Sequence, residues 1–363
     1  MCAKAFAVVS LLFVALGLAS AQDAGQADNV LTAWLDQANI HPPLRVGRLT
    51  IFPISLSQTN RLANVLTMEE ALGKKLLEVQ ELDDPQVPQA VFINRSKSQM
   101  IFLMAGEVII GGRQNRTLIS DALLGPDSRT TLSVYCVQRG RWEGRKGFAE
   151  SAVAPLSVQE KSMARSGQSE VWSEVRRANE RARSADASED LASGLAKPEN
   201  AKRLSAMRKL VEPKLPEKCA GIVVARDGRI IGADLFNSSE LFDSMRPRVL
   251  NVYFGEHLDE DVLPVKGARE APTQEQVRTY LQACYRASFS EGDRSGVGRL
   301  YSIRGAANGQ LLAYSPARIV PMREREDRVA PLAAECMVHA CLRPGLIPVK
   351  PEPVPMPRRE RDR

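Results

Sequence analysis

The sequence predicts an α+β fold with a β-rich, sandwich-like first half, a helical crossover and an α+β second half. Three observations predict this class. Short apolar runs rich in Val, Ile, Leu and Phe recur over residues 45–150 and are bounded by Gly, Pro, Asn or Asp, as β-strands are. Residues 157–183 place charges around a narrow apolar stripe, which is typical of an amphipathic helix. Strand and helix patterns then alternate over residues 218–342.

The N-terminus has the pattern of a secretory signal peptide over residues 1–21. Lys4 supplies a short positive region, and residues 6–18 form an apolar core that is too short to span a bilayer. Residues 19–21, Ala-Ser-Ala, fit the small-x-small rule for cleavage, so we expect Gln22 to be the mature N-terminus. An uncleaved anchor is the open alternative. The protein is therefore expected to be exported, either periplasmic or extracellular.

The chain after this signal is expected to contain a single domain between a loose lead-in and a tail. The lead-in is polar and without periodicity, and the tail alternates Pro with other residues, which denies it ladder hydrogen bonds. Residues 184–217 are rich in Ser, Ala, Lys, Glu and Pro and predict a mobile crossover. The predicted divisions are a signal peptide 1–21, a flexible lead-in 22–44, a single domain 45–342 (β-rich half 45–150, helix and crossover 151–217, α+β half 218–342) and a Pro-rich basic tail 343–363.

Local signals define several element boundaries. Thr67 with Glu70 and Thr273 with Gln276 have the spacing of capping boxes, so each predicts the start of a helix. Asp227-Gly228 between two apolar runs predicts a tight β-hairpin. Pro247 is expected to bend or divide the helix predicted over residues 239–254, because proline removes one backbone hydrogen bond.

The charge distribution favours no particular class of binding partner. The whole chain carries a net charge of +6, and loss of Lys4 with the signal leaves +5. The tail 343–363 holds six basic and three acidic residues, so it supplies most of this charge. It is either a solvated end or a weak contact for anionic surfaces. Nucleic-acid binding is not expected, because no motif for it is present.

Cysteine and histidine patterns do not predict a metal or cofactor site. Five cysteines remain after the signal, an odd number whose pairing cannot be derived from their spacing: Cys136, Cys219, Cys284, Cys336 and Cys341. Cys336, His339 and Cys341 resemble a zinc-ligand set at first sight. On a strand, however, His339 and Cys341 face one way and Cys336 faces the other. We therefore expect no metal and no cofactor.

Residues 106–142 contain the densest group of polar residues between strand patterns. These side chains cluster at glycines, where strands turn, and such clustering is typical of a recognition surface. Cys136 has apolar neighbours in sequence, which favours packing over a reactive thiol. The candidate ligand-binding residues are Glu107, Gln114, Asn115, Arg116, Arg139 and Trp142, with Cys136 and His339 as further candidates.

Several of these segments resemble a known family, the ARG and Rhodanese-Phosphatase-superfamily-associated protein domain. The resemblance runs from about residue 45 to 342 and implies no activity, because none is established for the family. Two positions depart from the family pattern: Gln138 and Asp234 each stand where the family has Glu. The matching segments are Gly106-Glu107, Gln114-Asn115-Arg116, Cys136-Val137-Gln138, Gly140-Arg141-Trp142, Leu235-Phe236 and His339.

Arg116 has two open roles. Its guanidinium can bind a ligand carboxylate or phosphate, or it can form an internal ion pair with Glu107. Strand periodicity places Gln114 and Arg116 on one face, with Arg113 and Asn115 on the other. The triplet therefore cannot face one site without a bulge in the backbone.

The leading hypothesis is an exported, non-enzymatic domain that binds a small polar or anionic ligand or a protein partner through these loops. One alternative is a hydrolase-type enzyme that uses Glu107 or Cys136 with His339. Another is a structural envelope protein in which the polar residues only tie strands together. Convergence of Glu107, Arg116, Cys136 and His339 on one cleft would favour the enzyme, whereas dispersal would favour binding or structure.

Overall fold

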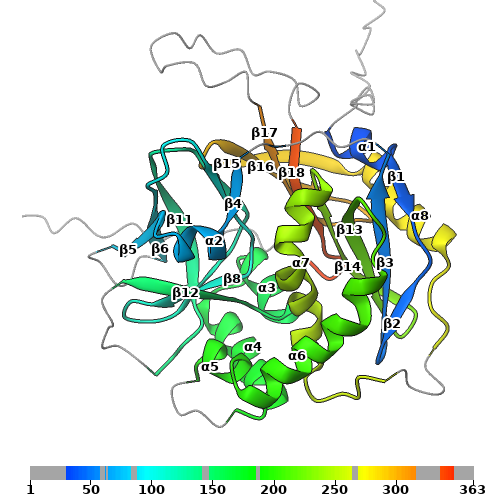
Figure 1. Cartoon of the computed structure of the whole chain (residues 1–363), viewed down its shortest axis with the longest axis horizontal. Coiled ribbons are helices and arrows are strands. Elements are labelled where there is room, and N and C mark those ends of the chain that lie inside the picture. Colours follow the sequence, from blue (N-terminus) through cyan, green and yellow to red (C-terminus); the bar gives the residue numbers. More distant parts are fainter. Residues whose placement is uncertain are drawn as a thin grey trace, which may run out of the picture.

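The computed structural model describes residues 30–57, 62, 64–82, 88–140, 147–184, 189–263, 269–315 and 336–346. These residues form the predicted α+β fold, with strands in three sheets and helices packed against them (Figure 1). The predicted signal peptide, Trp142 and most of the predicted tail lie outside the described residues. No helix in the described part of the chain is long and apolar enough to cross a membrane.

The largest sheet joins strands from both ends of the chain. Its nine strands follow the order β1-β3-β13-β14-β18-β17-β16-β15, with β2 also paired to β3, and all its pairings are antiparallel. The last described strand, β18, therefore lies inside the sheet between β14 and β17. The strands are β1 (Ala38–Ile40), β2 (Leu44–Val46), β3 (Leu49–Leu56), β13 (Cys219–Arg226), β14 (Arg229–Phe236), β15 (Ser288–Ser295), β16 (Gly298–Arg304), β17 (Gly309–Tyr314) and β18 (Cys336–Leu342).

The β-rich first half contains the other two sheets, which share one apolar core in a sandwich-like arrangement. Phe92 of the six-stranded sheet and Leu103 of the three-stranded sheet are both fully buried in it. The six-stranded sheet has the order β12-β8-β9-β11-β6-β5, and the three-stranded sheet has the order β10-β7-β4. Their strands are β4 (Val65–Thr67), β5 (Leu77–Glu81), β6 (Gln89–Asn94), β7 (Met100–Leu103), β8 (Glu107–Gly111), β9 (Arg116–Leu118), β10 (Ala122–Leu124), β11 (Ser128–Cys136) and β12 (Phe148–Val153).

Helices cover both faces of the large sheet. Along β13, Ile222 and Val224 pack in the core that contains α7, whereas Val223 packs in the opposite core with α1 and α8. This alternation follows the two-residue period of a strand. Figure 1 shows α7 between the first-half strands and the large sheet, with α1 and α8 beyond the sheet. The helices are α1 (Val30–Leu35), α2 (Met68–Gly73), α3 (Leu156–Met163), α4 (Gln168–Arg181), α5 (Leu191–Leu195), α6 (Pro198–Val211), α7 (Ser239–Phe254) and α8 (Gln274–Gln282), with short 3-10 turns η1 (Glu212–Lys214), η2 (Gly255–His257) and η3 (Ala283–Arg286).

The predicted local signals are confirmed. Both capping boxes form, with Thr67 and Thr273 accepting from the third helical residue, whose side chain bonds back to the cap. Asp227 and Gly228 connect β13 to β14 with positive φ angles of 48° and 79°. That conformation suits the two-residue turn of a tight hairpin.

Four predictions about particular helices and loops differ from the structure. The predicted flexible lead-in contains α1, where Leu31 and Trp34 are buried, followed by the pairing strands β1 and β2. The predicted mobile crossover contains α5, α6 and η1. The single helix predicted over residues 157–183 is two helices, α3 and α4, separated by Arg165 and Gly167 with positive φ angles. Pro247, predicted to bend or divide its helix, does not divide it, because α7 continues on both sides of it. In each case tertiary burial outweighs a weak local preference.

The predicted start of the tail is also wrong. Arg343 has no exposed surface and Leu346 is only 3% exposed, so the ordered domain extends to at least residue 346. In addition, β1, β2 and β3 belong to the large sheet of the second half rather than to the first-half sheets. Charge and proline content could not show that this arginine is buried.

Candidate ligand-binding site

Glu107 is fully buried, but it does not pair with Arg116. Its Oε2 accepts a hydrogen bond of 2.8 Å from the backbone N–H of Met104, and its Oε1 lies 3.3 Å from Nε of Arg248 in α7. Burial raises the pKa of Glu107 to about 7, although Arg248 opposes the shift. The predicted Glu107–Arg116 pair is therefore wrong, and Glu107 instead connects the first half to α7.

Arg116 lies in a different network. It faces Cys136 across the β9–β11 pairing, and its guanidinium donates to the Cys136 sulfur at 3.3 Å. The guanidinium also lies 3.4 Å from Oε1 of Glu81, at the end of β5. Burial raises the pKa of the Cys136 thiol, and nearby Arg116 only partly offsets this effect. A thiol in this state is not an activated nucleophile.

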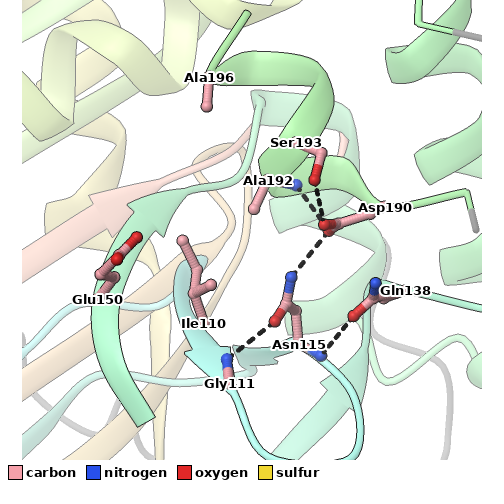
Figure 2. Close-up of a pocket in the computed structure, with 9 residues that line it drawn as sticks. All are labelled: Ile110, Gly111, Asn115, Gln138, Glu150, Asp190, Ala192, Ser193 and Ala196. Carbon is pink, nitrogen blue, oxygen red and sulfur yellow. Dashed lines mark hydrogen bonds between the residues drawn. The ribbon is translucent and has the colours of Figure 1, made fainter. Parts of the chain in front are cut away.

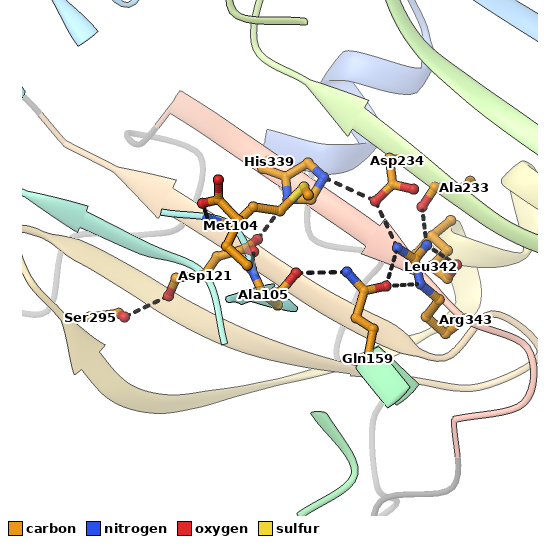
Figure 3. A network of polar contacts seen from close by, with 11 residues as sticks. Met104, Ala105, Asp121, Gln159, Ala233, Asp234, Ser295, His339, Leu342 and Arg343 are labelled. Carbon is orange, nitrogen blue, oxygen red and sulfur yellow. Dashed lines mark hydrogen bonds and ion pairs between the residues drawn. The ribbon is translucent and has the colours of Figure 1, made fainter. Parts of the chain in front are cut away.

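His339 lies in a third network, shown in Figure 3. Its Nδ1 is 2.7 Å from Asp121 Oδ2, and its Nε2 is 3.3 Å from Asp234 Oδ1. The ring stacks on Phe236 with 4.3 Å between centroids. Burial alone would lower the pKa of His339, but the two carboxylates outweigh burial and raise the pKa to about 9. The imidazole is therefore a buried cation held between two anions.

Arg343 completes this network from the end of β18. Its guanidinium donates to Asp234 Oδ1 at 2.8 Å, to Gln159 Oε1 at 2.8 and 3.0 Å and to the hydroxyl of Tyr253 at 3.1 Å. Burial would raise the pKa of Asp234, but Arg343 and His339 hold it well below its usual range. Gln159 in turn donates to the carbonyl of Ala105, so the network joins both halves of the fold.

Glu107, Arg116, Cys136 and His339 do not all contact one another, although Asp121, which binds His339, lies close enough to Glu107 to raise its pKa. A hydrolase-type mechanism needs a nucleophile and a base within hydrogen-bond reach of each other. Glu107, Cys136 and His339 instead have Arg248, Arg116 and the Asp121–Asp234 pair, respectively, as their charged neighbours.

A cavity of about 300 Å³ lies where the ends of the first-half strands meet α5 (Figure 2). Asn115 comes from the connection between β8 and β9, and Gln138 comes from the residues after β11. The cavity is lined by Ile110, Gly111, Asn115, Gln138, Glu150, Asp190, Ala192, Ser193 and Ala196.

Hydrogen bonds fix the polar wall of this cavity. Asn115 accepts at Oδ1 from the N–H of Gly111 at 2.9 Å, and its Nδ2 donates to Asp190 at 2.8 Å. Asp190 also accepts from the N–H of Ala192 at 3.1 Å and from the hydroxyl of Ser193 at 2.5 Å. The N–H of Asn115 donates to Oε1 of Gln138 at 3.3 Å. The wall is therefore positioned by its own contacts, as a preorganised binding site requires.

The predicted Gln-Asn-Arg triplet divides between different surroundings, but not through strand periodicity, because Gln114 and Asn115 lie in the connection between β8 and β9 and only Arg116 is in a strand. Asn115 lines the cavity, whereas Gln114 lies behind it and donates to the carbonyl of Gln138 at 2.8 Å. Arg116 contacts Glu81 and Cys136 as described above. Of the whole predicted set, Asn115 alone is a lining residue, and Trp142 lies outside the described residues.

Arg139 lies on the surface near this region without lining the cavity. Its guanidinium is 5.5 Å from the centroid of the Trp172 ring and 4.0 Å from Glu189. Glu189 also lies 3.8 Å from Arg176 of α4. Arg139 therefore packs against α4 and the residue before Asp190.

Four polar lining residues are absent from the candidates that the sequence indicates: Gln138, Glu150, Asp190 and Ser193. Asp190 precedes a helix of only five residues in a segment that was predicted to be mobile, although its position as an N-cap was a usable signal. Glu150 had no distinguishing pattern. Gln138 was noted only as a departure from a family motif, whereas here it holds the backbone of Asn115.

A family model described as the ARG and Rhodanese-Phosphatase-superfamily-associated Protein domain matches residues 37–322 of this chain. No curated protein and no solved structure matches it. The match includes every residue that lines the cavity. It ends before β18, which carries His339 and lies inside the large sheet.

Proposed function

Because this chain belongs to the family of the ARG and Rhodanese-Phosphatase-superfamily-associated Protein domain, whose description names an association and no reaction, we propose a function from the site itself. The protein is an exported ligand-binding domain, and its ligand occupies the cavity between β8, β12 and α5. The observation that carries this proposal is the polar wall formed by Asn115, Gln138 and Asp190 around an open cavity.

The cavity combines three properties of a binding site. Its volume of about 300 Å³ is at the lower end of the range for small-molecule sites. Its apolar surface comes from Ile110, Ala192 and Ala196, and hydrogen bonds position its polar residues Asn115, Gln138, Asp190 and Ser193. Three of the lining residues belong to α5 or its end, and others come from β8 and β12, so regular elements position much of the site.

The test fills the cavity and measures ligand binding. Ala196 is exposed at the end of α5 and lines the cavity, so Ala196→Phe is expected to fill it without disturbing the core. Thermal unfolding is followed with a panel of amino acids, sugars, amines, carboxylates and phosphates. At least one compound is expected to raise the Tm of the wild-type protein and not that of Ala196→Phe.

The matched control for this test is Ala33→Phe, at an exposed position of α1 that does not line the cavity. It should respond to the compound as the wild-type protein does. An equal Tm shift in Ala196→Phe, or no shift with any compound, would contradict the proposal.

The export part of the proposal rests on the sequence of residues 1–21. Protein secreted by its host is expected to begin at Gln22, as determined by N-terminal sequencing. A cell-retained chain that still begins at Met1 would exclude this cleavage.

A structural role is the second candidate, because one set of polar residues ties parts of the fold together. Arg248, Arg116 and Arg343 each bridge segments that are distant in sequence. A protein with this role alone would bind no compound in the cavity, so the same panel separates the two candidates.

A further inference from the structure

A second cavity, which we call the α8 cavity, lies on the side of the large sheet that α1 and α8 cover. It is formed by the residue after α1, by the end of α8 with η3, and by the connection between β16 and β17. Its volume of about 610 Å³ is within the range of small-molecule sites. None of the described residues lines both this cavity and the one beside α5. We propose that the α8 cavity binds a zwitterionic ligand, a small molecule with a carboxylate and an ammonium group, such as an amino acid.

Two charges of opposite sign line the α8 cavity without pairing with each other. Asp36 follows α1, and Arg286 is the last residue of η3. Both side chains lie in the described part of the chain, and no ion pair joins them there. Within that part, Arg286 has no hydrogen-bonding or ionic partner. Because the two charges line one cavity without meeting, a ligand that carries both signs can pair with each of them.

Tyr285 fixes the acidic end of the cavity. Its hydroxyl donates to Oδ1 of Asp36 and also lies 3.4 Å from the backbone carbonyl of Thr32. Burial and the neighbouring Asp36 carboxylate raise the pKa of Tyr285, so its hydroxyl stays protonated and remains the donor. A carboxylate offers about four acceptor positions, so this single bond leaves about three. An ammonium group has three donors and no acceptor, and it therefore suits the positions that remain on Asp36.

Arg286 supplies the complementary end. A guanidinium presents its donors in a planar fork that matches the two oxygens of a carboxylate. Gln282, four residues earlier, also lines the cavity and is exposed, so its amide can add a further hydrogen bond. A purely anionic ligand would leave Asp36 without an ionic partner, and a purely cationic one would leave Arg286 without one. A zwitterion is complementary to both residues.

The apolar part of the lining suits a short hydrocarbon chain between the two charged groups. Ala283 and Ala306 line the cavity together with the side chain of Tyr285. Methylene groups can pack against such surfaces, as they do along lysine stems. The number of methylene groups determines whether one molecule reaches both charges, so the affinity should depend on chain length.

The experiment compares amino acids with their singly charged analogues. The probes are glycine, β-alanine, γ-aminobutyrate and ε-aminocaproate, each with the carboxylate and the amine of the same chain length. Dissociation constants are measured by NMR titration of the mature chain carrying Ala196→Phe, which fills the cavity beside α5. At one chain length at least, the amino acid is expected to bind roughly threefold more tightly than both analogues, because it forms two exposed ion pairs instead of one.

Two substitutions separate the contributions of the charged residues. Arg286→Gln should weaken binding of the amino acid and of the carboxylate roughly two- to fivefold and should not weaken binding of the amine. Asp36→Asn, which keeps an acceptor for Tyr285, should weaken binding of the amino acid and of the amine and should not weaken binding of the carboxylate. The matched controls are Arg229→Gln and Asp259→Asn, at exposed positions that do not line the cavity, and they should leave every affinity unchanged.

Three results would overturn this proposal. If every amino acid bound no more tightly than its analogues, or if only one of the two lining substitutions weakened it, the ligand would not be a zwitterion. If the controls lost as much affinity as the lining variants, net charge rather than the cavity would determine binding. If no probe bound, the α8 cavity would not be a site for this class. None of these results bears on the cavity beside α5, which is tested by its own panel.

Discussion

The network around His339 and the cavity beside Asp190 use similar side chains under opposite conditions. In the network, Asp121, His339, Asp234 and Arg343 alternate in sign and are at most 1% exposed. Among the described residues that line the cavity, the charged ones are Glu150, which is exposed, and Asp190, which is 5% exposed. Each charge of the network thus has a neighbour of opposite sign, whereas the buried Asp190 accepts only from the neutral donors Asn115, Ala192 and Ser193.

This difference separates stabilising groups from binding groups. A charge removed from water must be paired and hydrogen-bonded, because its desolvation costs several kcal/mol. In the network, the charged side chains pair with one another, so none of these charges is left to bind a ligand. The exposed Glu150 stays hydrated and needs no charged partner, whereas Asp190 is satisfied by three hydrogen bonds from neutral groups.

The largest expected effect comes from removing a cation of the network. Arg343→Met leaves the buried carboxylate of Asp234 without its strongest partner and should cost roughly 3–5 kcal/mol in the free energy of unfolding. Urea unfolding of the mature chain measures this change. Deletion of residues 347–363, which lie beyond the buried Leu346, should shift the Tm by only a few degrees. A similar loss in both variants would show that the network is no more important than the tail.

The pH dependence of stability should show His339 as a buried cation. Its folded pKa of about 9 is above the unfolded value of 6.5, because Asp121 and Asp234 outweigh the effect of burial. The stability from its charge is fully present below pH 6.5 and is lost as pH rises through 9. The loss should be about 3 kcal/mol. Urea unfolding from pH 4 to 10 measures it, and His339→Gln should remove that part of the dependence.

Glu107 provides an internal control for this measurement. Burial raises its folded pKa to about 7, so the stability from its protonated form is lost as pH rises from 4.5 through 7. Glu107→Gln should remove the pH dependence of the free energy of unfolding in the lower range and leave the dependence in the higher range unchanged. If stability changed over only one pH range, and either substitution removed that change, the assignment to two separate titrating groups would be wrong.

A smaller effect is expected for the coupling between Glu107 and Arg248. A double-mutant cycle with Glu107→Gln and Arg248→Gln should give an interaction energy of about 1–3 kcal/mol, because the two side chains lie 3.3 Å apart and are buried. The same cycle with Arg116→Gln should be additive within about 0.5 kcal/mol, because Arg116 lies in another network. Coupling to Arg116 instead would restore the ion pair predicted from the sequence.

The smallest effect on stability is expected in the cavity. Glu150→Gln should change the free energy of unfolding by no more than about 0.5 kcal/mol, because the carboxylate is exposed and has no partner in the described part of the chain. Urea unfolding at pH 7 and low salt measures the change. A loss comparable to that of Arg343→Met would remove the distinction between the two regions.

Local sequence signals predicted helix starts and hairpins better than they predicted which side chains contact one another. The capping boxes of Thr67 and Thr273 and the Asp227-Gly228 hairpin depend on atoms within a few residues, so a sequence pattern contains the whole interaction. The lead-in was missed because α1 is a short helix stabilised by burial of Leu31 and Trp34 against the large sheet. The pattern of a short helix without caps is too weak to distinguish it from a loop.

By itself, the sequence determined the fold class, the family and the polar character of residues 106–142. Strand periodicity did not apply to Asn115, which lies in the connection between β8 and β9. Tertiary structure alone decided that Glu107 pairs with Arg248, that Arg343 is a buried cation and that Asp190 and Glu150 face one cavity. The physical reason is range: hydrogen bonds within a turn are encoded in adjacent residues, whereas a buried charge takes whichever partner the packing of distant strands and helices brings within about 4 Å.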